Sequence, residues 1–499
     1  MGKKLGSDII HLNIMGQSIV VLNSAQAASD LLDKRSAIYS DRVNAAMVND
    51  RALLDWSDFA GMLPYNDAWR RQRRRMTNWL NPRSVIQFNG LQQDEARLLL
   101  GRLLHLSGTP GLFEKVKHQF SFTTGSTMLR LIYGYRPKED QDSIYVNALQ
   151  ASINLFQSTM ISSQCRLLTL IHSKLLSRME RTDFLVNAFP ILARVPDWVP
   201  GTGWKRTARK WREQKNEAVN APYEWTKQQI AKGNFEHSIL SSLLDEDESS
   251  SELSIADQEK ELKQLCYTLF VGEDFAQHLR PECYKYVTYG QNQTGGTDTL
   301  ATAFLSFVAA MVTNPETQKK AQNEIDSVIG YATRLPTLAD SSQLPYIRQL
   351  TLEVMRWLPT APTGGPPHAC SQDDIYRGYN IQNGTMVAMS RDEVLYKDPE
   401  RFDPERFADP DVVSPPGFGW GRRKCPGTHF AEASLFLVIS SMLTTFALCC
   451  KVDKNGKEVT PKIEGDYNHL ALTIKPFEFE IRPRSEEHRQ LILDNIPKD

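Results

Sequence analysis

Apolar residues recur along most of the chain with the spacing of three and four residues that marks one face of an amphipathic helix. The clearest case is 256–271, where Leu262, Leu265 and Leu269 share such a face. Apolar runs around Gly16 and Pro476 predict strands. We therefore expect a mainly α fold with a smaller β portion, and no linker divides residues 1–499 into separate domains. The other predicted helices cover 25–32, 69–80, 94–106, 208–232, 299–312, 315–329 and 345–358, and the predicted strands 9–14, 19–22 and 470–481.

One apolar segment, 433–450, carries no charged residue over 18 positions. A hydropathy rule allows a marginal membrane span here, because a span needs about 20 apolar residues. A helix buried inside a large protein has the same composition. Five Ser and Thr residues dilute the segment, and we therefore favour the buried helix.

The charge balance and the cysteines narrow the function classes. Lys and Arg number 58 and Asp and Glu number 59, so the formal net charge is −1. A generic binder of nucleic acid or another polyanion is therefore not expected. The seven cysteines are an odd number and two of them, Cys449 and Cys450, are adjacent. This usage suits a reducing compartment better than a disulfide framework.

The most specific motif is the ten residues from Phe418 to Gly427, which read FGWGRRKCPG. Its glycines allow tight turns and a close approach of the backbone to a flat group. Cys425 comes just before a predicted helix, where the helix dipole favours a thiolate. Arg422 and Arg423 add fixed positive charge that can pair with an acid. A single cysteine near a helix is more often a packed core residue, but this combination favours a chemical role.

The motif resembles the Phe-x-x-Gly-x-Arg-x-Cys-x-Gly signature of the cytochrome P450 family, the haem-thiolate monooxygenases. The resemblance covers roughly residues 7–491 and is closest to fungal microsomal members. It implies the triangular-prism-like, mainly α fold of that family and a haem b cofactor whose iron takes Cys425 as axial ligand. It also implies that Arg423 pairs with a haem propionate and that Phe418 packs beside the sulfur.

A second motif, Glu353-Val-Met-Arg356, places an acid and a base on one face of a predicted helix. Alone it is weak, because a surface ion pair of little energetic value fits it equally well. In the family an arginine further along completes the pair and forms a structural network that holds the haem-binding loop. Arg401 and Arg406 both qualify, and we expect Arg406, on which the family pattern Asp-Pro-x-x-Phe-x-Pro-Glu-Arg-Phe ends.

The segment Gly295-Gly-Thr-Asp298-Thr299 resembles the oxygen-activation motif of the family's long central helix. Asp298 and Thr299 correspond to its acid–alcohol pair, whose catalytic role is to deliver protons to bound oxygen. Asp and Thr before an apolar helix are also ordinary N-cap residues. The two motifs already described favour the catalytic interpretation.

A cluster of five arginines lies between Trp69 and Arg75. The resemblance assigns Trp69 and Arg73 to a haem propionate, and His368 to a further propionate contact. Five arginines on a neutral chain are thin support for nucleic-acid binding. In the family this side docks an acidic electron donor, so we expect an NADPH-dependent flavoprotein reductase to bind on the Trp69–Arg75 side.

The chain departs from the family pattern at several places. It begins without the N-terminal membrane helix of microsomal members, so a chain made as written would be able to remain soluble. The resemblance nevertheless implies the cytosolic face of the endoplasmic reticulum membrane. Residues 162–181 and 272–294 look like inserts, and 384–391 is several residues shorter than the family's passage. Joining Val271 to Gly295 restores a helical pattern, so we hypothesise an imperfect gene model with retained introns.

Together the motifs predict a monooxygenase that inserts one atom of O2 into an apolar organic substrate, either a secondary metabolite or a xenobiotic. Its electrons would come from NADPH through the reductase, and the cofactor would carry the difficult chemistry. Two alternatives stay open. A haem-thiolate isomerase or dehydratase would keep the haem, although such enzymes often lose the acid–alcohol pair. A non-catalytic remnant of the family would bind no haem.

Overall fold

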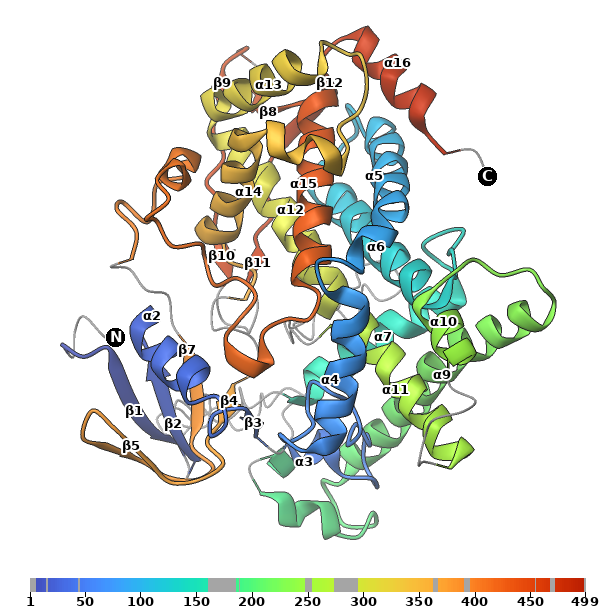
Figure 1. The fold of residues 1–499 in the computed structure, drawn as a ribbon, viewed down its shortest axis with the longest axis vertical. Helices are drawn as coiled ribbons and strands as arrows, with labels where there is room; N and C mark the ends of the chain where they lie inside the picture. Colours follow the sequence, from blue (N-terminus) through green and yellow to red (C-terminus); the bar gives the residue numbers. More distant parts are fainter. Residues whose placement is uncertain are drawn as a thin grey trace.

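Most of the chain that the structure describes is helical in this computed structural model, and the strands near the N-terminus lie to one side of the helices (Figure 1). The mainly α fold with a smaller β portion is therefore confirmed. Residues 162–181 and 273–294, which the sequence suggests are inserted, lie outside the described part. The structure describes residues 6–14, 17–43, 45–159, 185–187, 189–246, 254–272, 295–361, 367–389, 395–453, 455–466 and 472–497.

Helices form in each of the predicted segments, and the ends of those predicted from apolar spacing differ by up to about five residues. The helices at 46–49, 112–133, 143–159, 239–246 and 486–495 were not predicted. Ser24 caps the first of the predicted helices as expected, because its hydroxyl accepts a hydrogen bond from the Ala27 N–H (3.1 Å). That helix then continues as a π-helical turn, Ser29–Lys34. The helices are α2 Ala25–Ala28, α3 Ala46–Asn49, α4 Asp67–Leu80, α5 Asn89–Leu104, α6 Leu112–Tyr133, α7 Ser143–Thr159, α9 Gly203–Ala231, α10 Ile239–Glu246, α11 Ile255–Val271, α12 Gly295–Thr313, α13 Pro315–Ile329, α14 Pro345–Trp357, α15 Thr428–Thr445 and α16 Glu486–Asn495.

A five-stranded sheet joins the N-terminal segment to residues 368–389. The predicted N-terminal hairpin forms from β1 (Ile9–Ile14) and β2 (Gln17–Leu22), and β2 pairs in parallel with β7 (Met386–Met389) in the order β1-β2-β7-β4-β3. The short strands β3 (Asp41–Arg42) and β4 (His368–Ala369) pair at the end of this order. The remaining strands are β5 Asp374–Tyr376, β6 Tyr379–Ile381, β8 Phe446–Val452, β9 Glu458–Val459, β10 Gly465–Asp466, β11 Thr473–Ile474 and β12 Phe479–Pro483.

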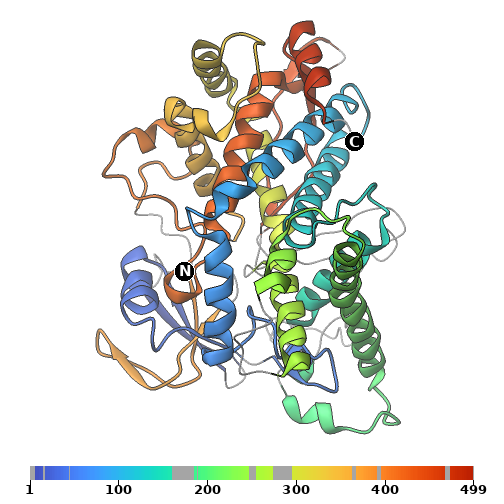
Figure 2. The same ribbon diagram turned by 45° about the vertical axis from the view of Figure 1, so that its right-hand side comes forward.

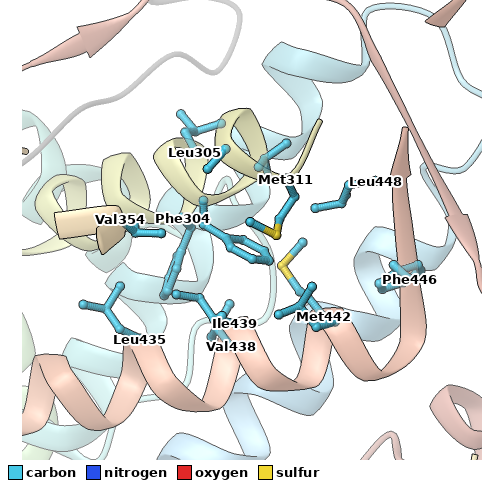
Figure 3. Close-up of a cluster of buried hydrophobic side chains, with 14 of the residues drawn as sticks. Phe304, Leu305, Met311, Val354, Leu435, Val438, Ile439, Met442, Phe446 and Leu448 are labelled. Carbon is cyan, nitrogen blue, oxygen red and sulfur yellow. The ribbon is translucent and has the colours of Figure 1, made fainter. Parts of the chain in front are cut away.

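The helical part has two hydrophobic cores, and one of them lies between α12, α14 and α15. Figure 3 shows Phe304 of α12 pointing toward Val438 and Ile439 of α15, and all three side chains are buried. Burying side chains of this size stabilises the fold by about 1.5–3 kcal/mol each. The two long helices are thus held together near the middle of α15, which begins at Thr428, three residues after Cys425.

The apolar segment 433–450 belongs to this core. Up to Thr445 it is the buried helix that we favoured, and its hydroxyls are satisfied internally, as when Ser440 and Thr444 donate to the carbonyls of Phe436 and Ser440 (2.6 and 2.8 Å). The expectation of a helix is wrong for 446–450, because this part forms β8 and pairs with β12. Within the described residues, every helix is too short or too polar to cross a membrane.

Candidate functional site

A cavity lies in the helical part, where α4, α11, α12 and the loop before α15 meet. Its wall is mainly apolar, as is usual for small-molecule sites. Cys425 and Phe418 line the cavity from the loop, and Thr299 lines it from α12. Residues that the sequence singles out in two separate motifs therefore share one cavity.

The loop that carries Cys425 is held in a tight turn. The Cys425 N–H donates to the Phe418 carbonyl (2.8 Å), and the Thr428 hydroxyl donates to the Cys425 carbonyl (2.8 Å). Gly421 has a φ of +60°, and a Cβ atom there would lie 1.9 Å from the backbone oxygen of Leu32, so only glycine fits. Since α15 begins at Thr428, the thiol lies at the N-terminal end of a long helix, where the dipole stabilises a thiolate.

The side chain of Glu353 is completely buried and lies at the centre of a charge network. Arg356 donates to both of its carboxylate oxygens (2.7 and 2.9 Å), and Arg406 Nε lies 3.1 Å from Oε2. The Asp403 N–H donates to Oε1 as well (2.7 Å). Burial of all three charges excludes the surface ion pair that the sequence also allowed.

The two arginines of this network also bind backbone carbonyls of the segment 397–406. Arg356 donates to the carbonyls of Pro399 (2.7 Å) and Arg401 (3.1 Å), and Arg406 donates to that of Lys397 (2.7 Å). The network thus ties this segment to α14. Arg401 contributes only its backbone carbonyl to the network. The arginine whose side chain joins Glu353 and Arg356 is Arg406.

A cation lies against an aromatic ring behind the Cys425 loop. The guanidinium of Arg423 lies 4.4 Å from the centre of the Trp69 ring, and both side chains are buried. Three of the five N–H groups of Arg423 are directed at the backbone carbonyls of Ser40, Ala60 and Leu63 (2.7–3.1 Å). The indole N–H of Trp69 is buried and finds no hydrogen-bond partner among the residues that the structure describes.

Two further predicted residues lie near this pair. Arg73 of α4 donates to the Lys424 carbonyl, next to Cys425. His368 is buried on β4, opposite Arg42 of β3, and burial lowers its pKa to about 3, with further lowering by the positive charges of Arg42 and Arg423. The ring is therefore neutral at pH 7. Nδ1 lies 2.7 Å from the Tyr39 carbonyl, which can only accept, so Nδ1 carries the proton and Nε2 is an acceptor.

The acid–alcohol pair is described only in part. Thr299 lines the cavity, whereas Asp298 is described through its place in the first turn of α12 alone. Because α12 begins at Gly295, both residues lie inside the helix and neither is its N-cap. Figure 2 shows α11 and α12 following one another in space, and the end of α11 lines the same cavity as Thr299.

The arginine cluster of α4 is divided between the surface and the interior. Arg70, Arg71 and Arg74 are exposed, and Arg70 pairs with Asp67 (2.6 Å). Sequence reasoning missed Tyr65, whose ring centre lies 4.6 Å from the guanidinium group of Arg70 and 5.0 Å from that of Arg422. It also gave Arg42 no role. The contacts of Tyr65 with Arg422 and of Arg42 with His368 have no signal in the local sequence, because each joins segments more than 300 positions apart.

The fold and this site define a class of protein, one with a half-buried cysteine on the wall of an apolar cavity and a buried glutamate–arginine network. The family model for cytochrome P450 matches residues 2–272 and 286–481. Cytochrome P450 monooxygenase 98 of Postia placenta is 34% identical over 98% of this chain and 86% of its own length. Cytochrome P450 monooxygenase claR of Ampulloclitocybe clavipes is 31% identical over 98% and 82%, respectively.

The chain therefore belongs to the cytochrome P450 family, a family of oxidoreductases. The resemblance in the cysteine motif is thus confirmed at the level of the family. Haem is the cofactor that this family implies, and the residues present fit it. The cavity has a thiol on its wall, and the Cys425 loop carries the buried cation Arg423 against Trp69, whose indole N–H has no partner in the described structure. A flat apolar group with anionic substituents would satisfy both features.

Proposed function

We propose that this chain is a haem-dependent monooxygenase that inserts one atom of O2 into an apolar organic substrate, either a secondary metabolite or a xenobiotic. The observation that carries the proposal is the shared cavity, in which the Cys425 loop and Thr299 of α12 line one apolar space. Haem b, when bound, would supply the activation of O2 and the insertion of oxygen. The relatives named above, all monooxygenases, support the reaction class.

Each predicted residue then has a role that its position allows. Cys425 would be the thiolate ligand of the iron, and Phe418 would pack beside the sulfur. Arg423, Trp69 and Arg73 would hold propionates, because they bring two cations and an indole N–H to one side of the loop. In its present neutral form the His368 ring offers a propionate only a hydrogen-bond acceptor, which cannot bind an anion. The negative charge of a propionate placed there would favour protonation of the ring, and the protonated ring could then donate to it.

The supporting parts of the proposal concern the whole chain. Glu353, Arg356 and Arg406 would keep the loop in place, since they join it to α14 through segment 397–406. We propose one catalytic unit over 1–499, with 272–294 as an insert in the central helix. The interruption of the family match at 273–285 supports that insert. Residues 162–181 remain a predicted insert.

The electron source and the location remain proposals of the same kind. An NADPH-dependent flavoprotein reductase with an acidic face would dock on the Trp69–Arg75 side, where Arg70, Arg71 and Arg74 are exposed. The endoplasmic reticulum membrane, on its cytosolic face, is the location that the resemblance predicts. An isomerase or dehydratase would turn over without NADPH, and a haem-free remnant would not turn over at all.

Replacing Thr299 by alanine is expected to divert electrons from product to peroxide. Thr299 would hold a proton donor in the cavity, and losing such a group lowers the coupled rate by roughly 10²-fold or more. The measurement is the ratio of product formed to NADPH consumed, with reductase present. Thr313→Ala is the matched control, because Thr313 lies at the far end of α12 and donates to the Ala309 carbonyl. Equal coupling in both variants would contradict the role of Thr299.

A further inference from the structure

Two stripes of side chains run along the interface of α4 and α11 and end at the cavity. On α4, Gln72 is followed at intervals of four by Met76 and Leu80, and both of these line the cavity. On α11, Glu261 and Gln264 are followed by Thr268, which lines the cavity as well. Residues at these spacings share one helix face, so each stripe is polar at its outer end and reaches the cavity at its inner end.

The two stripes run in the same direction. At the outer end Arg71 Nε of α4 lies 3.5 Å from Glu261 Oε1 of α11, and Arg71 is half exposed. One turn further in, the charge of Arg75 acts on the buried thiol of Cys266, partly offsetting the rise in its pKa that burial causes. The pairs 71–261 and 75–266 therefore lead inward along both helices, toward the cavity end at Thr268.

Buried polar atoms along this interface lack partners in the part of the chain that the structure describes. The amide oxygens of Gln72 and Gln264 are buried and accept no hydrogen bond there. Oε1 of Glu261 is buried too and has the ion pair with Arg71 as its contact. Gln72 is only 3% exposed, and its amide N–H is already directed at the Asp58 carbonyl (3.0 Å). A buried acceptor without a donor is destabilising, and ordered water is the usual donor in such places.

We propose that the interface of α4 and α11 is a hydrated seam that carries protons from the surface at Arg71 and Glu261 to the cavity at Thr268. Water molecules in the seam would donate to the Gln72 and Gln264 oxygens and join the Thr268 hydroxyl to the outside. That hydroxyl donates to the Gln264 carbonyl (2.7 Å), and its lone pairs can accept from a water. Gln72, Gln264 and Thr268 are then positioning residues for a proton path separate from Asp298 and Thr299.

The inference rests on the proposed function, because the stoichiometry of that reaction requires a supply of protons to the cavity. Insertion of one oxygen atom consumes O2, two electrons and two protons for each substrate C–H bond, and yields one C–OH group and one water. The electrons come from NADPH through the reductase. The protons must cross an apolar wall, and the product water must leave through it. A hydrated seam with hydrogen-bond acceptors at intervals provides a route for protons to enter and for the product water to leave.

The first test is direct observation of the waters in a crystal structure at a resolution that shows them. We expect ordered waters within hydrogen-bond distance of the Gln72 and Gln264 amide oxygens in the unaltered chain. In Gln264→Leu we expect those waters to be lost while the helices keep their places. A dry seam in the unaltered chain would overturn the proposal, whatever the enzyme's activity.

The second test separates proton delivery from a merely structural role. Gln264→Leu is expected to lower coupled product formation by roughly tenfold, less than the ~10²–10⁴ that acid–base catalysis can supply, because the route through Thr299 remains. Its solvent hydrogen isotope effect should rise, and its carbon-monoxide band should be unchanged. The control is Gln228→Leu on the exposed face of α9. If the seam holds water but Gln264→Leu has the same coupling and the same isotope effect as Gln228→Leu, the proton path is overturned. An unaltered chain without a thiolate-type band would instead contradict the proposed function, and the waters would then decide whether the seam exists.

Discussion

Cys425→Ser is expected to abolish the thiolate-type carbon-monoxide difference band of the reduced protein. The sulfur lies on the cavity wall at the N-terminal end of α15, and a hydroxyl in its place is a far weaker donor to iron. The loop itself should survive, because its turn depends on backbone contacts of Phe418, Gly421 and Thr428 rather than on the sulfur. If the band is lost while the fold is retained, the loss therefore reports only the missing bond between the Cys425 sulfur and the iron.

The matched control for this substitution is Cys449→Ser. Cys449 is a free, partly exposed cysteine on β8, and it does not line the cavity. Its variant is expected to keep the band at full intensity. A thiolate-type spectrum from Cys425→Ser, or equal loss in both variants, would refute the assignment of Cys425 as the ligand.

Glu353→Ala is expected to destabilise the fold by about 3–5 kcal/mol, the cost of removing one partner from a buried charge network. The substitution would leave Arg356 and Arg406 buried without their common carboxylate and would release the Asp403 N–H. Because these arginines hold segment 397–406, haem retention should fall together with stability. The measurement is the free energy of unfolding in denaturant, alongside the haem content.

Two controls separate the network from ordinary surface charge. Glu405 pairs with Lys320 at the surface, so Glu405→Ala is expected to cost less than about 1 kcal/mol. Arg406→Ala should destabilise strongly and Arg401→Ala weakly, since Arg401 contributes only its carbonyl to the network. A Glu353→Ala variant as stable as Glu405→Ala would show that the network does not hold the loop.

The local sequence was sufficient to predict those parts of the fold and the site that neighbouring residues determine. The turn at Gly421 needs a glycine, and Glu353 and Arg356 are one helical turn apart, so both motifs could be recognised directly. The same holds for the hairpin of β1 and β2 and for the start of α13 at Pro315, because turn and cap residues act locally.

Contacts between distant segments could not be predicted. The three carbonyls that bind Arg423 belong to residues 40, 60 and 63, and nothing near position 423 points to them. The charge of Arg42 near His368 arises from a strand pairing across more than 300 residues. The end of α15 at Thr445 was missed for the same reason, since pairing with β12 decides it and the apolar composition of 446–450 suits a helix as well.

The central claim is that this chain, as written, holds haem through Cys425. The most direct test is the ratio of haem to protein in the purified chain, measured together with the reduced carbon-monoxide difference spectrum after expression with a haem supply. We predict about one haem per chain and a thiolate-type Soret band. A colourless protein that is nevertheless folded would contradict the claim and leave only membership of the family.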